Sequence, residues 1–525
     1  MEHLPSLILV LTVLAGVSLL SRRVAAPESV LLALAGLAWS QIPNLPRPEI
    51  EPELVLAVLL PPLLYSETWA TSWLDFRRWL RPILQLAIGL VGFTILVVGL
   101  VAHWAMPVLP WPVCFLLGAI VSPTDTVAVQ TVLERLRAPR RTTAILGGES
   151  LVNDATGLLG VGLATVVVMT GEFQPVAIGL SFARIAGLGL AIGAAVGWLA
   201  ADLNRRVRGT HALFALSLVA PYAAYFVAEE AGASGVLAVV IAGFVSSWRQ
   251  NNIAPESRVE MYSAWDQLAF VLNGLMFLFI GLEALSRLSE ALESAPRVVT
   301  GALFVSAAVI VARIAWAFPT GYLPPALAPR LRALEGGYPD VRSVTIGAWC
   351  GVRGAVSLAA ALSVPHVLPA DGAPFPGRAE IIACTLVVIL VTLLGQGLTL
   401  LPLVRWLGLS DADLTAAEVR RARAAMLAAG IARLDAFCSE HGCPIAVRRY
   451  REVMVDELEA LRAVDELART RAREHRDVAI EVRRAVYVAQ TDALLTLRDG
   501  GGMNDRIHQE LQLALDRANA DLVEP

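Results

Sequence analysis

The chain has 525 residues, of which 56% are hydrophobic and only 17% charged, and its mean hydropathy is +0.62. Because soluble globular domains carry about 25% charged residues, this composition excludes an ordinary soluble protein and indicates a membrane protein. The formal net charge of −4 is little guide to partners, since the charges are unevenly distributed. We expect a lipid environment, no nucleic-acid partner and no cofactor.

Apolar segments long enough to cross a bilayer recur along the first 405 residues. A span takes about 20 mostly apolar residues, and the segments shortest for that length are 28–42, 52–66 and 234–248. Residues 4–20 precede the pair Arg22 and Arg23 instead of following it, so we expect a first span and not a cleaved leader. The thirteen expected spans are 4–20, 28–42, 52–66, 82–106, 110–133, 142–169, 175–202, 210–230, 234–248, 261–283, 297–320, 343–364 and 379–404.

The arginines between these spans fall in alternate loops. One set of loops holds Arg22, Arg23, Arg77, Arg78, Arg81, Arg135, Arg137, Arg140, Arg141, Arg205, Arg206, Arg208, Arg249, Arg258, Arg330, Arg332 and Arg342. The other set holds only Arg47, Arg287, Arg297 and Arg378. Because Arg-rich loops face the cytoplasm, we expect the N-terminus outside the cytoplasmic membrane and the C-terminus inside it.

The composition changes near residue 410. Residues 410–525 are rich in Arg, Asp, Glu and Ala, with apolar side chains at helical spacing. We therefore predict a transmembrane domain over 1–409 and a cytoplasmic helical domain over 410–525, which packs or dimerises in preference to binding a regulatory ligand. Cys438, His441 and Cys443 are a weak sign of a metal site, because metal sites usually combine two such Cys/His pairs and only one is present here.

Two carboxylates lie inside the span 142–169, within the run Gly147-Gly-Glu-Ser-Leu-Val-Asn-Asp-Ala-Thr-Gly157. An ionised carboxylate within a bilayer is costly, so it usually faces a partner or a wet cavity and marks an ion or proton pathway. Ser150, Asn153 and Asp154 share one helix face. Glu149 is rotated about 140° from Asp154, so we expect the two acids to have different partners.

Two other spans are interrupted by polar residues. The span 110–133 contains Ser122-Pro-Thr-Asp-Thr126, where Pro123 removes a backbone donor, and the span 343–364 contains Gly351-Val-Arg-Gly354. Interrupted spans in corresponding positions of two halves indicate a transport site. They are the fifth and twelfth spans, so an inverted repeat would relate them. The sequence predicts an all-α membrane protein with two discontinuous helices.

The charged side chains suggest that one acid has a structural role and the other binds ions. Asp154 can face a cavity together with Asp125 and Thr124, whereas Glu149 needs a buried cation. Arg313 is the arginine available within an apolar span. A carboxylate held by Arg stays ionised and structural, while a free one can bind either a proton or a cation. Competition for one carboxylate is the simplest form of exchange.

Two further residues refine this scheme. Arg353, in the second break, is an alternative partner for Glu149 and could offset the partial charges of broken helix ends. Asn153 places an amide and not a second acid beside Asp154. We therefore infer one proton exchanged for one monovalent cation, which is electroneutral.

At these residues the chain resembles the monovalent cation:proton antiporters, in the branch of bacterial and animal sodium/proton exchangers. The resemblance covers most of residues 5–405. It is carried by Gly148-Glu-Ser-Leu-Val-Asn-Asp-Ala155, Ser122-Pro-Thr-Asp125, Gly351-Val-Arg-Gly-Ala-Val-Ser357 and Gly395-Gln-Gly-Leu-Thr399. It implies a homodimer with a dimerisation domain and a mobile core domain, in which the fifth and twelfth spans cross.

The resemblance also assigns residues. It implies that Asp154 carries cation and proton, surrounded by Asn153, Ser150, Asp125 and Thr124, with Na+ bound through Asp154, Thr124 and Ser150. It implies that Glu149 and Arg313 form a structural ion pair, and that Gly351, Arg353 and Gly354 form the break. Many members place an acid at the position of Ser66, where this chain has Glu67 one residue later.

The expected function is therefore secondary active antiport of Na+, and of Li+ or K+, for H+, in the service of pH homeostasis. A K+/H+ antiporter is the close alternative, and a passive cation channel is a more distant one. An enzyme is not expected, because Ser150 lacks a nearby His that could act as its base.

Overall fold

The structure is a computed structural model of the chain. It describes residues 4–21, 23–24, 26–43, 45, 55–136, 138–207, 209–249, 255–294, 297–334, 337–368, 372–409, 412–462 and short pieces between 481 and 519. The chain divides into two compact units, residues 1–411 and 412–525. Within the described residues the regular structure is helical, apart from an isolated β-bridge between Val367 and Pro374.

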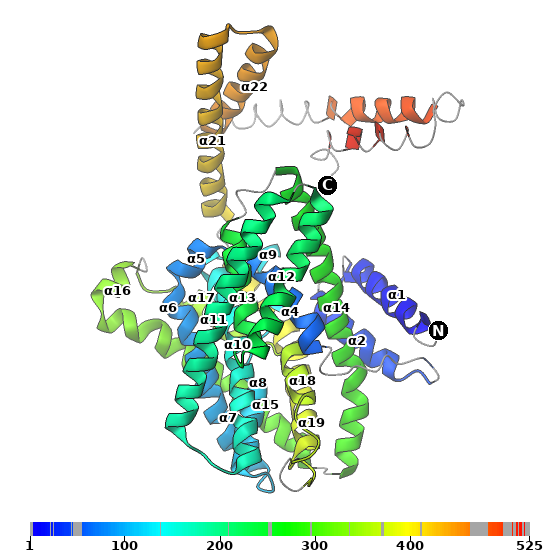
Figure 1. Cartoon of the computed structure of the whole chain (residues 1–525), viewed down its shortest axis with the longest axis vertical. Helices are drawn as coiled ribbons and strands as arrows, with labels where there is room; N and C mark the ends of the chain where they lie inside the picture. Colours follow the sequence, from blue (N-terminus) through cyan, green and yellow to red (C-terminus); the bar gives the residue numbers. More distant parts are fainter. Residues whose placement is uncertain are drawn as a thin grey trace. The chain divides into compact units, whose positions relative to one another are not determined.

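The first unit is a bundle of helices, some of them interrupted (Figure 1). In chain order they are α1 (Leu4–Ser21), α2 (Glu28–Ser40), η1 (Val55–Leu59), α4 (Leu60–Ala70), α5 (Trp73–Arg78), α6 (Leu80–Leu84), η2 (Gln85–Leu90), α7 (Val91–Ala105), α8 (Trp111–Val121), α9 (Val127–Arg135) and α10 (Arg140–Thr170). They continue with α11 (Pro175–Arg206), α12 (Thr210–Glu230), α13 (Gly235–Trp248), α14 (Pro255–Ser294), α15 (Arg297–Leu327), α16 (Pro329–Leu334), α17 (Val341–Trp349), α18 (Ala355–Leu362), α19 (Arg378–Val391), η4 (Thr392–Gln396) and α20 (Gly397–Leu407). The elements η1, η2 and η4 are π-helical turns.

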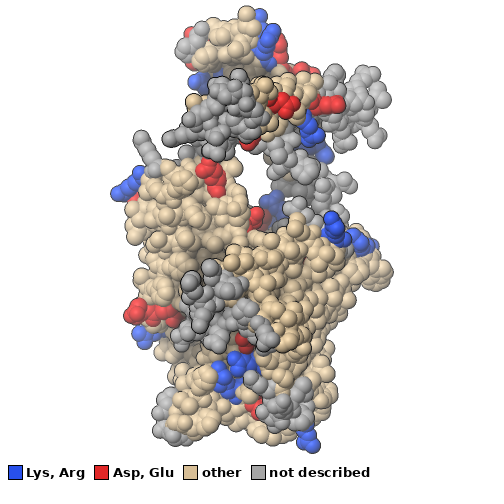
Figure 2. Space-filling model, turned by 90° about the vertical axis from the view of Figure 1, so that its right-hand side faces the viewer, with Lys and Arg blue, Asp and Glu red and all other residues tan. Residues whose placement is uncertain are grey.

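The apolar helices confirm the predicted all-α membrane fold. In the described residues, seven helices are long and apolar enough to cross a bilayer, and five shorter apolar helices accompany them. Large apolar side chains such as Val176 and Leu180 are exposed on the surface, and Figure 2 shows broad uncharged areas with charges in small groups. Such surface is stable in lipid and not in water. The count of thirteen spans and the inverted repeat remain predictions.

Small residues allow the closest helix contacts. On α11, Gly189, Gly193 and Gly197 face the backbone of α13 at four-residue spacing. A Cβ at Gly197 would lie 2.6 Å from the carbonyl oxygen of Ala242, so a larger residue could not be accommodated without moving one helix. This is the spacing of small residues by which membrane helices approach closely, because no hydrophobic effect draws helices together within lipid.

Both predicted helix breaks occur at the predicted motifs. Non-helical residues 122–126 separate α8 from α9, and residues 350–354 separate α17 from α18. The two breaks contact each other, because the backbone N–H of Asp125 donates to the carbonyl of Val352 at 2.8 Å. Backbone groups freed from both helices thus satisfy one another, as buried polar groups in a membrane must.

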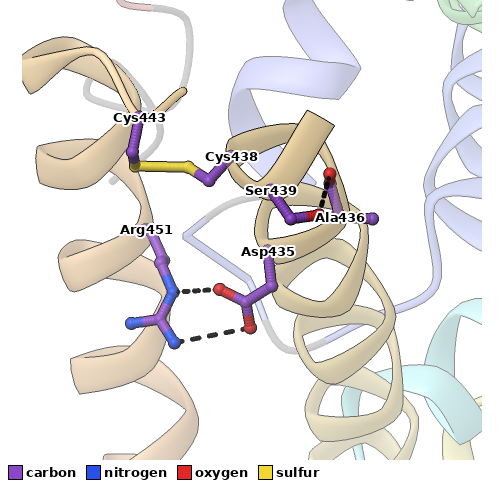
Figure 3. Close-up of a disulfide and its surroundings, with 6 residues drawn as sticks. All are labelled: Asp435, Ala436, Cys438, Ser439, Cys443 and Arg451. Atoms are coloured by element: carbon purple, nitrogen blue, oxygen red, sulfur yellow. Dashed lines mark hydrogen bonds and ion pairs between the residues drawn. A yellow bond between two sulfur atoms is a disulfide. The ribbon is translucent and has the colours of Figure 1, made fainter. Parts of the chain in front are cut away.

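The second unit begins with a helical hairpin of α21 (Ala412–His441) and α22 (Ile445–Arg462). Cys438 and Cys443 form a disulfide across its turn, so the structure pairs these sulfurs with each other instead of presenting two metal ligands (Figure 3). The side chain of His441 lies outside the described residues. Arg451 donates to Asp435 at 2.5 and 3.4 Å, and this hydrogen bonding holds the pKa of the Asp435 carboxyl below its ordinary value.

Candidate ion-binding site

The two acids of α10 have different partners. Glu149 accepts from Nη1 of Arg313 at 2.5 Å and from Nη2 at 2.9 Å, and both side chains are fully buried. The hydroxyl of Thr124 also donates to Glu149 at 3.1 Å, and Nε of Arg313 donates to the carbonyl of Gly347 at 3.1 Å. The bidentate pair balances both buried charges, which is the arrangement that makes a buried ion pair tolerable.

Thr124 connects this pair to the polar face of α10. Asn153 donates through Nδ2 to the Thr124 hydroxyl at 2.6 Å, and the hydroxyl of Ser150 donates to the Thr124 carbonyl at 3.3 Å. Since the same Thr124 hydroxyl donates to Glu149, a chain of hydrogen bonds runs from Asn153 to Arg313. These contacts fix the first helix break against α10.

Asp154 lies in a different environment, against a small cavity of about 30 Å³. Its side chain is 7% exposed, and it has no hydrogen-bond partner among the described residues. The polar residues that line the cavity are Glu67, Asp125, Ser150, Asp154, Asn273 and Ser357. Of the residues predicted around Asp154, the structure thus brings Asp125 and Ser150 to the cavity, whereas Thr124 and Asn153 are not among its lining residues.

The two walls of this inner cavity differ in chemistry. Helices α4 and α14 contribute mainly apolar side chains, namely Leu60, Leu63, Leu64, Met276 and Phe277, with Glu67 and Asn273 as their polar members. Helix α10 and the first helix break contribute Asp125, Ser150 and Asp154. Three carboxylates therefore face one cavity, which is large enough to hold a water molecule or an ion of similar size. They repel one another unless a cation or a proton lies between them.

A second, wider cavity of about 480 Å³ adjoins the first. Glu67 and Asn273 line both cavities, whereas Asp75, Arg140 and Asp266 line only the wide one. We call the wide cavity the vestibule. Its lining includes polar side chains from several elements, so it can hold water and hydrated ions.

Helix α14 follows the whole route between these cavities on one face. Asp266 and Ala269 line the vestibule, Asn273 lines both cavities, and Met276 and Phe277 line the inner cavity. Residues spaced by three and four lie above one another on a helix, so Asn273 marks the level at which the route narrows. Glu67 of α4 stands at the same boundary.

The second helix break places its charge and its glycines differently. Arg353 does not contact Glu149 as a partner. Its side chain is fully buried, and its guanidinium nitrogens have no hydrogen-bond partner among the described residues, while its backbone N–H donates to the Thr392 hydroxyl at 3.0 Å. A Cβ at Gly351 would lie 2.7 Å from Cδ of Arg313, and a Cβ at Gly354 would collide with the carboxylate of Asp125. Both glycines therefore make room for charged side chains of the site.

Sequence reasoning identified Glu67 only as a departure from a pattern and did not single out Asn273. The sequence does contain an indication of Asn273, because this amide lies within the apolar run from Leu268 to Leu282. A polar side chain within a membrane span usually faces a cavity or a partner. The signal for Glu67 was weaker, since the acid is close to the end of its apolar segment.

Comparison with known proteins gives a consistent result. A family model described as "Sodium/hydrogen exchanger, transmembrane" matches residues 8–406. An uncharacterized Na+/H+ exchanger of Mycobacterium tuberculosis is 34% identical over 537 residues, covering 98% of this chain and 95% of the relative. A sodium, potassium, lithium and rubidium/H+ antiporter of Bacillus pumilus is 32% identical, covering 75% of this chain and 60% of the relative.

A solved structure is similar as well. The sodium proton antiporter of Methanocaldococcus jannaschii aligns with a TM-score of 0.61 at 20% sequence identity, covering 78% of this chain and 99% of that chain. At this identity the likeness shows a shared fold.

Proposed function

The chain belongs to the sodium/hydrogen exchanger family, and from this premise we propose that it exchanges Na+ for H+ across the cytoplasmic membrane by alternating access. Its relatives are cation/proton antiporters, so it is a multi-pass membrane transporter and not an enzyme. The resemblance found in the sequence is thereby confirmed at the level of the family.

The observation that carries the proposal is the contrast between two neighbouring acids of one helix. Glu149 accepts three hydrogen bonds and is neutralised by Arg313. Asp154 has no hydrogen-bond partner in the described part of the chain and faces a cavity. We assign Glu149 and Arg313 to structure, and Asp154 to the cation and the proton, which compete for it.

The cavity offers oxygen ligands, which hard cations prefer. The carboxylate of Asp154 and the hydroxyl of Ser150 belong to the proposed Na+ site, and Glu67 joins them from α4. Thr124 was expected to be a direct ligand. Because its hydroxyl already contacts Asn153 and Glu149, we propose instead that Thr124 positions the site.

The vestibule gives this site its direction of access. It is lined by Asp75 and Arg140, which bind each other at 3.0 Å, and Arg140 belongs to the loops expected on the cytoplasmic side. We propose that the vestibule opens to the cytoplasm, with the N-terminus outside, the tail inside and a homodimer as the working unit. In this arrangement Na+ passes Glu67 and Asn273 to reach Asp154.

The test is cation-driven proton movement in proteoliposomes that enclose a pH-sensitive dye. Addition of Na+ should move protons in the wild type, and Asp154→Asn should abolish this while the protein stays folded, because a neutral side chain loses less hydration energy on burial. Asp266→Asn, which removes an acid from the vestibule alone, is the matched control and should retain exchange. Robust Na+-driven flux by Asp154→Asn would overturn the assignment.

A K+/H+ antiporter is the second candidate, and the Bacillus pumilus relative, named for Na+, K+, Li+ and Rb+, supports testing it. The same proteoliposomes should be given Na+, Li+ and K+ in separate runs. Proton movement with K+ alone would favour this candidate. Cation flux that needs no counter-movement of protons would instead indicate a passive channel.

A further inference from the structure

A groove outside the transport route lies between α6, η2 and α15. Its inner end is a pocket of about 90 Å³ lined by Arg81, Gln85, Arg141, Thr142, Thr320 and Ser343, among others. We call this the head pocket. It continues into a wide, open groove of about 840 Å³, the tail groove, because Arg81, Gln85 and Thr320 line both.

The head pocket is chemically suited to an anion. Arg81 and Arg141 bring two guanidinium groups, and none of the residues in its lining is Asp or Glu. The Thr142 side chain is 5% exposed, and its hydroxyl has no hydrogen-bond partner within the described residues although it lines the pocket. A buried hydroxyl without a partner is costly, so a bound acceptor would satisfy it.

Aromatic stacking holds the second arginine in place. The guanidinium carbon of Arg141 lies 4.4 Å from the ring centre of Trp79, and that of Arg78 lies 5.3 Å from the same ring. Trp79 itself is buried, so it is a fixed platform for these side chains. Clustered Arg at the cytoplasmic ends of spans lies near the lipid headgroups, and we place the head pocket at the depth of the lipid phosphates on this ground.

The tail groove is apolar and open to the surroundings. It is lined by Leu80, Leu84, Ile88, Trp316, Leu323 and Pro324, among others, and Leu323 is 57% exposed. Two irregularities leave this space between the helices, the π-helical turn η2 on one side and the prolines of α15 on the other. An acyl chain would cover this surface.

From these features we propose that the groove binds an anionic phospholipid of the cytoplasmic leaflet. Its phosphate lies between Arg81 and Arg141 and accepts from Thr142, and one acyl chain lies in the tail groove. The continuity of a cationic pocket with an apolar groove selects a lipid over free phosphate, which would leave the tail groove unfilled.

The site is placed to influence transport. In the first turns of α10, Arg141, Thr142, Ile145 and Leu146 face the head pocket, whereas Arg140, Thr143, Ala144 and Gly147 face the vestibule. Gly347 also lines the head pocket, and its carbonyl accepts from Arg313. A bound lipid thus touches the helix that carries Glu149 and Asp154. Its effect on exchange rests on the proposed function, whereas its binding does not.

Binding can be tested on the full chain in detergent by thermal unfolding and native mass spectrometry. Phosphatidylglycerol should raise the unfolding temperature and remain bound, whereas phosphatidylcholine should do neither. Each arginine near a charged lipid surface is worth about 1 kcal/mol, so Arg81→Gln and Arg141→Gln should each weaken binding roughly fivefold. Arg77→Gln removes the same charge from an exposed site outside both cavities and should leave binding unchanged.

Further variants and ligands make the proposal falsifiable even if an arginine variant fails to fold. Thr142→Val and Leu323→Gln keep every charge, and both should weaken the binding of phosphatidylglycerol. Inorganic phosphate that stabilises as well as the lipid would overturn the proposal in favour of an anion pocket. If Arg77→Gln weakened lipid binding as much as Arg81→Gln and Arg141→Gln do, binding would depend on general surface charge and not on this pocket, which would overturn the proposal. Loss of the dimer in Leu323→Gln with unchanged lipid binding would assign the groove to a second copy of the chain.

Discussion

The two acids of α10 differ in how they are held. Glu149, Arg313, Thr124 and Asn153 are joined by a continuous set of hydrogen bonds. Asp154 faces the cavity without such a partner. A transporter needs both kinds, because the bound ion must be released while the protein around it keeps its shape.

The first prediction concerns the buried pair. Removing one member leaves an uncompensated buried charge, which typically costs about 3–5 kcal/mol. Glu149→Gln and Arg313→Ala should therefore each lower the unfolding temperature more than Asp154→Asn does, as measured by differential scanning fluorimetry. The double variant should be more stable than the sum of the single losses, and strict additivity would contradict the pairing.

The second prediction concerns Asn273, at the boundary between vestibule and inner cavity. Replacing the amide with an apolar side chain removes a polar group from the boundary between the two cavities. A hydrogen bond to a charged group contributes about 1.5–3 kcal/mol, so Asn273→Leu should raise the KM for Na+ by roughly tenfold or more. Ala269→Leu, one turn away in the vestibule, is the control. An unchanged KM in Asn273→Leu would remove this residue from the ion's path.

At the scale of elements, the main feature is the close contact between the breaks of the two interrupted helices. The breaks share a backbone hydrogen bond between Asp125 and Val352. Gly354 has no side chain at the point where the Asp125 carboxylate lies, and Gly351 has none where Arg313 passes. The glycines of the second break therefore matter for the space they leave as well as for backbone freedom.

This gives the third prediction. Gly354→Ala should push the breaks apart, and because overpacking a buried contact costs about 1–3 kcal/mol, it should lower both stability and exchange. Gly162→Ala in α10, where nothing lies within 4 Å of the added Cβ, should be neutral or slightly stabilising, since Ala favours helix over Gly. Thermal unfolding of both variants is the measurement, and equal behaviour would contradict the steric role of Gly354.

The elements also show what could be predicted from sequence. Both breaks were predictable, because Pro123 and the Gly351–Gly354 motif disrupt helices through local chemistry. The partner of Glu149 could be narrowed to Arg313 or Arg353, since few cations lie in apolar spans, but only packing separates the two. The cavity lining was harder to predict. Asn273 and Glu67 come together with Asp154 through contacts between helices distant in sequence, and no local pattern encodes such contacts.

At the scale of the whole molecule, the inner cavity bears on the stoichiometry of exchange. The sequence placed an amide, Asn153, beside Asp154, which favours one proton per cation. The structure adds Glu67 to the cavity that Asp154 and Asp125 face, so a carboxylate from outside the two predicted motifs lies within reach of the ion. If Glu67 gains and loses a proton during the cycle, exchange moves net charge. If Glu67 stays ionised as a ligand of Na+, exchange is electroneutral.

We expect Glu67 to remain a fixed ligand, so that exchange is electroneutral. The measurement is the equilibrium extent of Na+-driven pH change in proteoliposomes held at different potassium–valinomycin potentials. A net charge moved across 100 mV is worth about 2.3 kcal/mol, which would shift the equilibrium gradient roughly fiftyfold, so even a partial dependence would be visible. No shift is expected for the wild type, and Glu67→Gln should weaken Na+ binding without introducing one. If the wild type does respond to voltage and Glu67→Gln removes the response, Glu67 is a second proton carrier and the cycle moves net charge.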